Sequence, residues 1–131
     1  MGLSAWPWAE AVLTDLYQHY DEPSSWHVAH GALEAFTAMR RAGIKVAIVS
    51  NWDTRLPVLL RKLGFREGDG EALDAVIVSA EECSEKPDRR IFDIALERLG
   101  LTASGGGGGA GVVHVGDSTV NDVVGRCKLT P

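Results

Sequence analysis

The sequence predicts an α/β fold in which helices cover a parallel β-sheet. Short β-branched runs alternate along the chain with stretches whose apolar residues recur at helical spacing, and this alternation is typical of parallel sheets. The 131 residues, 45% of them hydrophobic, are enough for one modest globular domain with its own core. Helices are expected at 8–20, 32–42, 55–64 and 87–100, and strands at 45–50, 74–79 and 112–116.

The expected helices are recognised by their apolar spacing and by the residues at their ends. The first, at 8–20, lies outside the alternation with strands and is expected to belong to a separate helical element. The second ends at Gly43 and the third at Gly64, because glycine readily adopts the left-handed conformation that closes a helix. The fourth carries Pro87 in its first turn and is followed by Gly100.

The expected strands read "KVAIVS", "DAVIVS" and "VVHVG". Ligands of open parallel sheets bind beyond the carboxyl ends of the strands, so the polar residues that follow each strand are the first candidates for a site. Ser50 ends the first run and Asn51 follows it, Lys86 lies in the segment after the second, and Asp117 follows the third. The sequence therefore predicts a site that combines a hydroxyl, an amide, an ammonium and carboxylates at one edge of the sheet.

Composition excludes several classes of partner. The net charge is −5, from 13 Lys and Arg against 18 Asp and Glu, whereas a nucleic-acid surface needs clustered basic charge. No apolar run reaches the length that crosses a bilayer. Cys83 and Cys127 have neither disulfide-framework nor metal-ligand spacing. We expect a soluble cytoplasmic protein with no nucleic-acid or membrane partner, and the sequence leaves the oligomeric state open.

The run "SGGGGGAG" at 104–111 is expected to be a flexible linker. It contains a formal G-x-G-x-x-G match, which five consecutive glycines make almost automatic. A dinucleotide-binding fingerprint follows a strand and opens a helix. Here the run follows a helix and precedes a strand, so it predicts no nucleotide site.

Asp117 and Asp122 place two carboxylates at the end of the last expected strand. Two like charges about 6 Å apart repel by roughly 2–3 kcal/mol at an effective dielectric of about 20. Mg²⁺ would remove this repulsion, because it binds one or two carboxylates and completes its octahedron with water and phosphate. The alternative is that Asp117 begins a turn and Asp122 lies in the first turn of a helix, where a negative charge is favourable.

Lys86 and Ser50 are candidates for binding a phosphate. Lys86 precedes Pro87 just ahead of a helix, where a fixed ammonium could neutralise a phosphate. Ser50 could donate its hydroxyl to a phosphoryl oxygen. Taken singly, each also fits a structural role, as a solvated surface lysine and as a polar residue that ends a strand. His114 lies within an expected strand and is interpreted as a packed histidine.

Three segments in this order resemble the haloacid dehalogenase (HAD)-like hydrolase superfamily: "VAIVSNWD" with Ser50, "EKPDRRIF" with Lys86, and "VVHVGDSTVND" with its two acids. The resemblance implies a Rossmann-like three-layer α/β/α core with part of a helical cap. Residues 1–28 would be the cap remnant and 29–131 a partial core. The resemblance favours phosphate-ester hydrolysis over carbon–halogen cleavage, because the true dehalogenases match the acid pair less well.

The resemblance also implies roles for the matching residues. Ser50 and Lys86 would be catalytic, and together with Asn51 they would bind the phosphoryl group of a phosphorylated small molecule. Asp117 and Asp122 would hold Mg²⁺.

The sequence departs from the family pattern at its nucleophile. The family's aspartate nucleophile belongs to a D-x-D motif that ends an N-terminal strand, and no D-x-D occurs in the 131 residues. That strand would also lie in the middle of the sheet, so we expect an incomplete core, a truncated chain and no turnover. The alternatives are a non-catalytic HAD-derived binding module and an unstable fragment. A receiver domain is disfavoured, because no acidic cluster precedes a phosphoacceptor strand.

Overall fold

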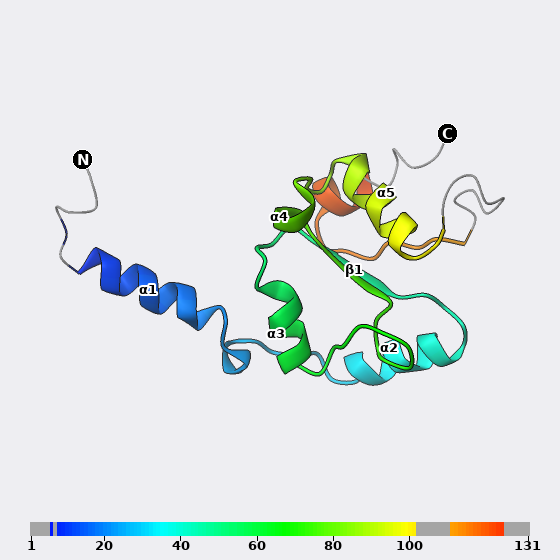
Figure 1. The fold of residues 1–131 in the computed structure, drawn as a ribbon, viewed down its shortest axis with the longest axis horizontal. Coiled ribbons are helices and arrows are strands. Elements are labelled where there is room, and N and C mark those ends of the chain that lie inside the picture. Colours follow the sequence, from blue (N-terminus) through cyan, green and yellow to red (C-terminus); the bar gives the residue numbers. More distant parts are fainter. Residues whose placement is uncertain (1–5, 7, 102–110, 125–131) are drawn as a thin grey trace.

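The computed structural model describes residues 6, 8–101 and 111–124, and Figure 1 shows their arrangement. Two parallel strands lie between helices that come from both halves of the chain. The elements in chain order are the helix α1 (Ala9–His19), the 3₁₀-helix η2 (Pro23–Ser25), α2 (Ala32–Arg41), β1 (Ala47–Ser50), α3 (Leu56–Lys62), β2 (Ala75–Val78), the short α4 (Ser79–Glu82), α5 (Arg89–Arg98) and the π-helix η3 (Thr119–Val124).

The sheet pairs β1 with β2 in parallel, in a register that runs from Ala47 opposite Ala75 to Ser50 opposite Val78. Because both strands run in the same direction, their carboxyl ends meet at one edge of the sheet. All four residues of β2 are buried, as expected for a strand that is covered on both faces. The α/β class and the parallel pairing predicted from the sequence are confirmed.

Two apolar clusters, one on each face of the sheet, join the sheet to the helices above and below it and so form three layers. On one face, Val76 and Val78 of β2 join a cluster to which α2 and α3 contribute Phe36 and Leu60. On the other face, the alternate residues of β2 pack with α5, because successive side chains of a strand point to opposite faces. This second cluster consists of Ala75, Ile77, Ile91, Phe92 and Ala95.

The prediction of a third strand at 112–116 is wrong, because this segment has an irregular conformation. Within the described residues the sheet has only two strands. A β-strand forms only when its backbone hydrogen-bonds to a neighbouring strand. The family's first strand would lie between β1 and 112–116, and it has no counterpart among the described residues. The segment 112–116 therefore has no partner with which to form a strand. The segment nevertheless runs beside α5 (Figure 1), where the ring of His114 packs against Phe92 at 5.2 Å.

At the opposite end of the sheet, Asp74 fixes the start of both strands. Its carboxylate accepts the backbone N–H of Val46 at 2.7 Å and forms an ion pair with Arg40 of α2. Arg40 also donates to the backbone carbonyls of Gly68 and Glu71. One guanidinium thus ties α2, the connection before β2 and the sheet together.

α1 extends away from the sheet (Figure 1) and leaves its large apolar side chains exposed to solvent, whereas Ala9 at its start is buried. It is held near its C-terminal end, where the guanidinium of Arg55 lies 3.6 Å from the ring of Tyr17. The expected cap segment 1–28 thus includes α1 and η2, although residues 1–5 and 7 lie outside the described residues, as does most of the expected linker at 104–111. No helix in the described part of the chain is long and apolar enough to cross a membrane.

Candidate active site

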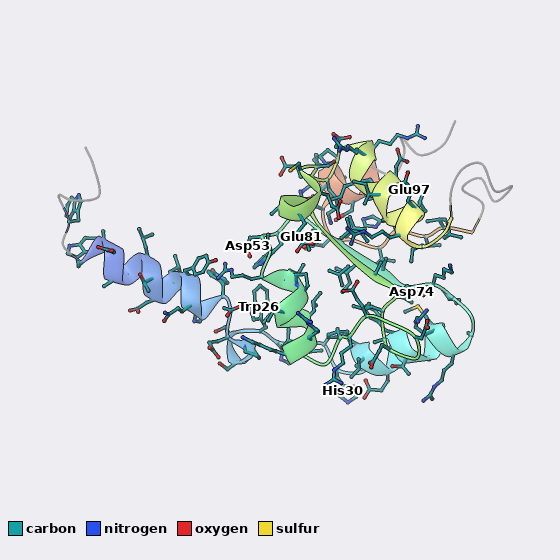
Figure 2. All side chains as sticks on the ribbon, viewed as in Figure 1. Trp26, His30, Asp53, Asp74, Glu81 and Glu97 are labelled. Carbon is teal, nitrogen blue, oxygen red and sulfur yellow. The ribbon has the colours of Figure 1, made fainter. Side chains whose placement is uncertain are left out.

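The candidate site lies at the carboxyl ends of β1 and β2. Figure 2 shows Asp53 and Glu81 at this end of the molecule and Asp74 at the other. Ser79, which follows β2, links the two strand ends: its hydroxyl accepts the N–H of Trp52 at 3.0 Å and donates to the Trp52 carbonyl at 3.1 Å. The backbone that leaves β1 is thereby held against the end of β2.

Asn51 brings Lys86 to the end of β1. The Asn51 amide donates to the Lys86 carbonyl at 2.9 Å and accepts the Lys86 N–H at 2.7 Å. A carboxamide can make this reciprocal pair because it carries a donor and an acceptor side by side. The sequence predicts Asn51 as a substrate-binding residue, and the structure shows that its amide holds the backbone of Lys86.

Lys86, His114 and Asp122 form the polar centre of the site. Asp122 is only 3% exposed, and its Oδ1 atom lies 2.7 Å from Lys86 Nζ and 2.9 Å from His114 Nε2. Its Oδ2 atom accepts the N–H of Ser118 at 2.9 Å. The hydrogen bond from Lys86, then those from His114 and Ser118, hold the pKa of the Asp122 carboxyl well below its usual range, although burial acts in the opposite direction.

Gly116 makes room for this carboxylate. A Cβ atom on Gly116 would collide with the carboxylate of Asp122 and would lie 2.7 Å from its Cβ. The Asp122 side chain therefore folds back over Gly116, where it also meets the N–H of Ser118. The segment from Gly116 to Asp122 therefore forms a closed loop, with the buried carboxylate of Asp122 at its centre.

The two acids predicted as metal ligands have different surroundings. Asp117 is exposed and Asp122 is buried. The sequence predicts a dication as the counter-charge of the pair, and in the structure Lys86 already supplies a positive charge to Asp122. Sequence reasoning missed this pair because it depends on residues 36 positions apart.

Asp117 and Asp122 offer carboxylate oxygens, the type of donor that Mg²⁺ prefers. Asp117 is accessible, and within the described residues Oδ2 of Asp122 accepts one hydrogen bond, which leaves it a lone pair. No group of three or more His, Cys, Asp or Glu side chains converges in the described part of the chain. A magnesium ion at Asp117 and Asp122 would therefore take most of its ligands from water and phosphate, as this ion commonly does.

Ser50 lies at the last position of β1 and is half-buried, opposite Val78. The contributions of His114, Ser79 and Gly116 were missed from the sequence. The sequence marks Gly116 only as the residue before Asp117, and it gives no signal for the contact of His114 with Asp122. The contacts of Asp122 with His114 and with Gly116 both depend on how the chain folds back after residue 116.

The family assignment follows from a comparison with protein families. The model of the haloacid dehalogenase-like hydrolase family matches residues 6–125. The chain belongs to this family. The resemblance inferred from the three segments around Ser50, Lys86 and Asp117 is thereby confirmed.

Individual HAD-like hydrolases are similar over most of this chain. Haloacid dehalogenase-like hydrolase domain-containing protein 3 of Mus musculus is 38% identical over 87% of the chain, and the human protein of that name is 32% identical over the same share. The crystal structure of an HAD phosphatase from Thermococcus onnurineus is similar with a TM-score of 0.72 and 26% identity, over 90% of this chain and 49% of that one. The chain spans 41% of the length of the mouse and human relatives.

Proposed function

We propose that this chain is the phosphate-binding part of a Mg²⁺-dependent HAD-type phosphatase that acts on the phosphate monoester of a small molecule. In this proposal Ser50 and Lys86 bind the phosphoryl group, and Asp117 and Asp122 hold the metal. One observation carries the proposal: Lys86 and Asp122 meet in a partly buried ion pair at the carboxyl ends of the strands. A cation and an acid at this edge are the groups that a phosphate and its metal require.

The geometry gives each polar residue a distinct task. The ammonium of Lys86 has three N–H donors, and its bond to Asp122 uses one of them, so the others can bind phosphoryl oxygens while Lys86 stays in place. Ser50 can donate its hydroxyl from the end of β1. Asn51 contributes indirectly, because its side-chain NH₂ donates to the Lys86 carbonyl and its side-chain oxygen accepts the Lys86 N–H.

Mg²⁺, when bound, would neutralise the charge that develops on the phosphoryl oxygens. The 131 residues contain no D-x-D motif, so they lack the aspartate that forms the covalent phosphoryl intermediate in this family. We therefore expect these residues alone to bind Mg²⁺ and phosphate without turnover. The alternative function is a non-catalytic HAD-derived module that binds phosphorylated molecules. It is favoured by the polar residues at the carboxyl ends of the strands together with the absence of a D-x-D motif from the 131 residues.

Calorimetric titration tests the binding. MgCl₂ is titrated into the purified chain, and inorganic phosphate is then titrated in the presence of MgCl₂. Lys86→Met should weaken phosphate binding by about tenfold or more, because a hydrogen bond from a charged group contributes about 1.5–3 kcal/mol. Lys62→Met, which removes an exposed lysine of α3, is the matched control and should leave binding unchanged. A wild-type chain that is folded but binds neither ion contradicts the proposal.

A turnover assay separates the enzyme from the binding module. The chain is incubated with p-nitrophenyl phosphate and MgCl₂, and its Asp117→Asn variant is measured in parallel. Turnover that Asp117→Asn abolishes would show that these residues suffice for catalysis and that our expectation of inactivity is wrong. Binding of phosphate without turnover supports the module, and turnover that is unaffected by the substitution indicates a contaminating phosphatase.

A further inference from the structure

His114 is held in one orientation by the core of the protein. Its ring packs edge-on against Phe92 of α5, with ring centroids 5.2 Å apart and planes at 83°. Phe92 is itself buried and belongs to the cluster between α5 and the sheet. An edge-to-face pair of this kind restricts both rings, so the imidazole of His114 presents Nε2 to Asp122 from a fixed position.

The contact requires a proton on Nε2 of His114. Asp122 is ionised, because its hydrogen-bond partners stabilise the carboxylate form. An ionised carboxylate only accepts hydrogen bonds, so Nε2 of His114 is the donor to Oδ1. Lys86 donates to the same oxygen, and both lone pairs of Oδ1 are thereby engaged. The remaining lone pair belongs to Oδ2.

We propose that His114 is a positioning residue for the Asp122 carboxylate and that it presents Oδ2 to a metal ion. This inference rests on the proposed function, in which Asp122 is a ligand of Mg²⁺. Lys86 cannot perform the task alone, because its ammonium rotates at the end of a flexible stem and is also needed for phosphate. The imidazole of His114, packed against Phe92, is the partner of Oδ1 that has no second ligand to bind.

The test measures metal affinity in variants that keep or remove the donor. Mn²⁺ suits the same oxygen ligands as Mg²⁺, and its binding is read from the relaxation of water protons or from its electron paramagnetic resonance signal. In His114→Gln the amide nitrogen takes the place of Nε2 and keeps the donor. In His114→Phe the ring is kept against Phe92 without a donor, and in His114→Asn the amide is too short to reach Asp122. His30→Phe is the matched control, because His30 is exposed and lies beside α2 on the other side of the sheet from α5 (Figure 2).

We expect His114→Phe and His114→Asn to raise the dissociation constant for Mn²⁺ by about 10–100-fold, the usual effect of removing the hydrogen-bond partner of a metal ligand. His114→Gln and His30→Phe should remain close to the wild type. Tryptophan fluorescence confirms that each variant is folded, and if His114→Phe unfolds, His114→Asn provides the comparison. The long-range ¹H–¹⁵N spectrum of the imidazole should show a proton on Nε2 in the wild type.

The outcomes distinguish this inference from the proposed function. Equal Mn²⁺ affinity in the wild type and His114→Phe overturns the role of His114, while the metal site itself stands. Affinity in His114→Gln as low as in His114→Phe overturns it too, because the donor would then not be the cause. A wild-type chain that binds no Mn²⁺, although its imidazole shows the expected proton, overturns both. Loss of affinity in His114→Phe without any loss in Asp117→Asn supports the inference and removes Asp117 from the site.

Discussion

Substitution of Asp122 by asparagine should destabilise the protein, whereas the same substitution at Asp117 should not. Asp122 is 3% exposed and accepts hydrogen bonds from Lys86, His114 and Ser118. Asparagine has one acceptor oxygen, so whichever way its amide turns, at least one of the three donors faces its NH₂ group. Asp117 carries the same side chain on the exposed side of the same loop, which makes it a matched control.

The expected magnitude follows from these contacts. A donor that loses its acceptor in a buried site costs about 1–3 kcal/mol, and the remaining bonds lose the assistance of the negative charge. Together these effects predict that Asp122→Asn lowers the free energy of unfolding by about 2–4 kcal/mol. Asp117→Asn is expected to change it by less than about 0.5 kcal/mol, as is usual for exposed sites.

Urea unfolding at neutral pH without added metal measures both variants. Tryptophan fluorescence is a suitable signal, because Trp26 and Trp52 pack against each other with ring centroids 5.2 Å apart near the site. Equal stability of Asp122→Asn and the wild type would refute the reasoning, since the network around Asp122 would then contribute nothing to the fold. A large loss in Asp117→Asn would refute it as well.

Three further predictions concern the same fold. Gly116→Ala should lower the free energy of unfolding by about 1–3 kcal/mol, because its Cβ would collide with Asp122; an unchanged urea midpoint would show that the loop yields easily. The folded-state pKa of Asp122 lies below its unfolded value of about 4, so the stability from this group is fully present above pH 4 and is lost as the pH falls through the folded-state pKa. Thermal unfolding measured between neutral and acid pH should therefore decline less steeply in Asp122→Asn than in the wild type, and parallel curves would contradict this assignment. Ile77→Ala, which opens a cavity at a fully buried position of β2, should cost about 2–5 kcal/mol, whereas the exposed Ile44→Ala should cost far less in the same urea assay.

The sequence was a good guide to elements whose formation depends on local pattern. The four helices expected from apolar spacing correspond to α1, α2, α3 and α5, and the runs around Ala47 and Ala75 form the two strands, each within a few residues. The strand expected at 112–116 failed because pairing is a non-local property. Its residues have the composition of a strand, but no neighbouring strand lies beside them among the described residues.

For the candidate site too, the sequence predicted the features that depend on local pattern and missed those that depend on non-local contacts. The rule that ligands bind at the carboxyl ends of parallel strands pointed to Ser50, Asn51 and Lys86, and the structure places these three residues at one edge of the sheet. The rule could not predict that Asn51 would bind the backbone of Lys86, or that Asp122 would be buried and Asp117 exposed. Those outcomes depend on the path of the chain after Gly116, which brings the carboxylate to Lys86 and His114 by contacts that no periodicity encodes.

The pairing of β1 on one side has a consequence for how the chain behaves at high concentration. Within the described residues, its other side presents backbone amides and carbonyls with no strand beside them, and its central residues, Ile48 and Val49, strongly favour β-structure. An unpaired strand edge of this kind is a template for pairing with another extended chain, including a second molecule of the same protein. We expect this chain to form β-rich aggregates over time in concentrated solution, which thioflavin fluorescence would detect. A short β-strand peptide added in excess should slow aggregation, because it would pair with the free edge of β1.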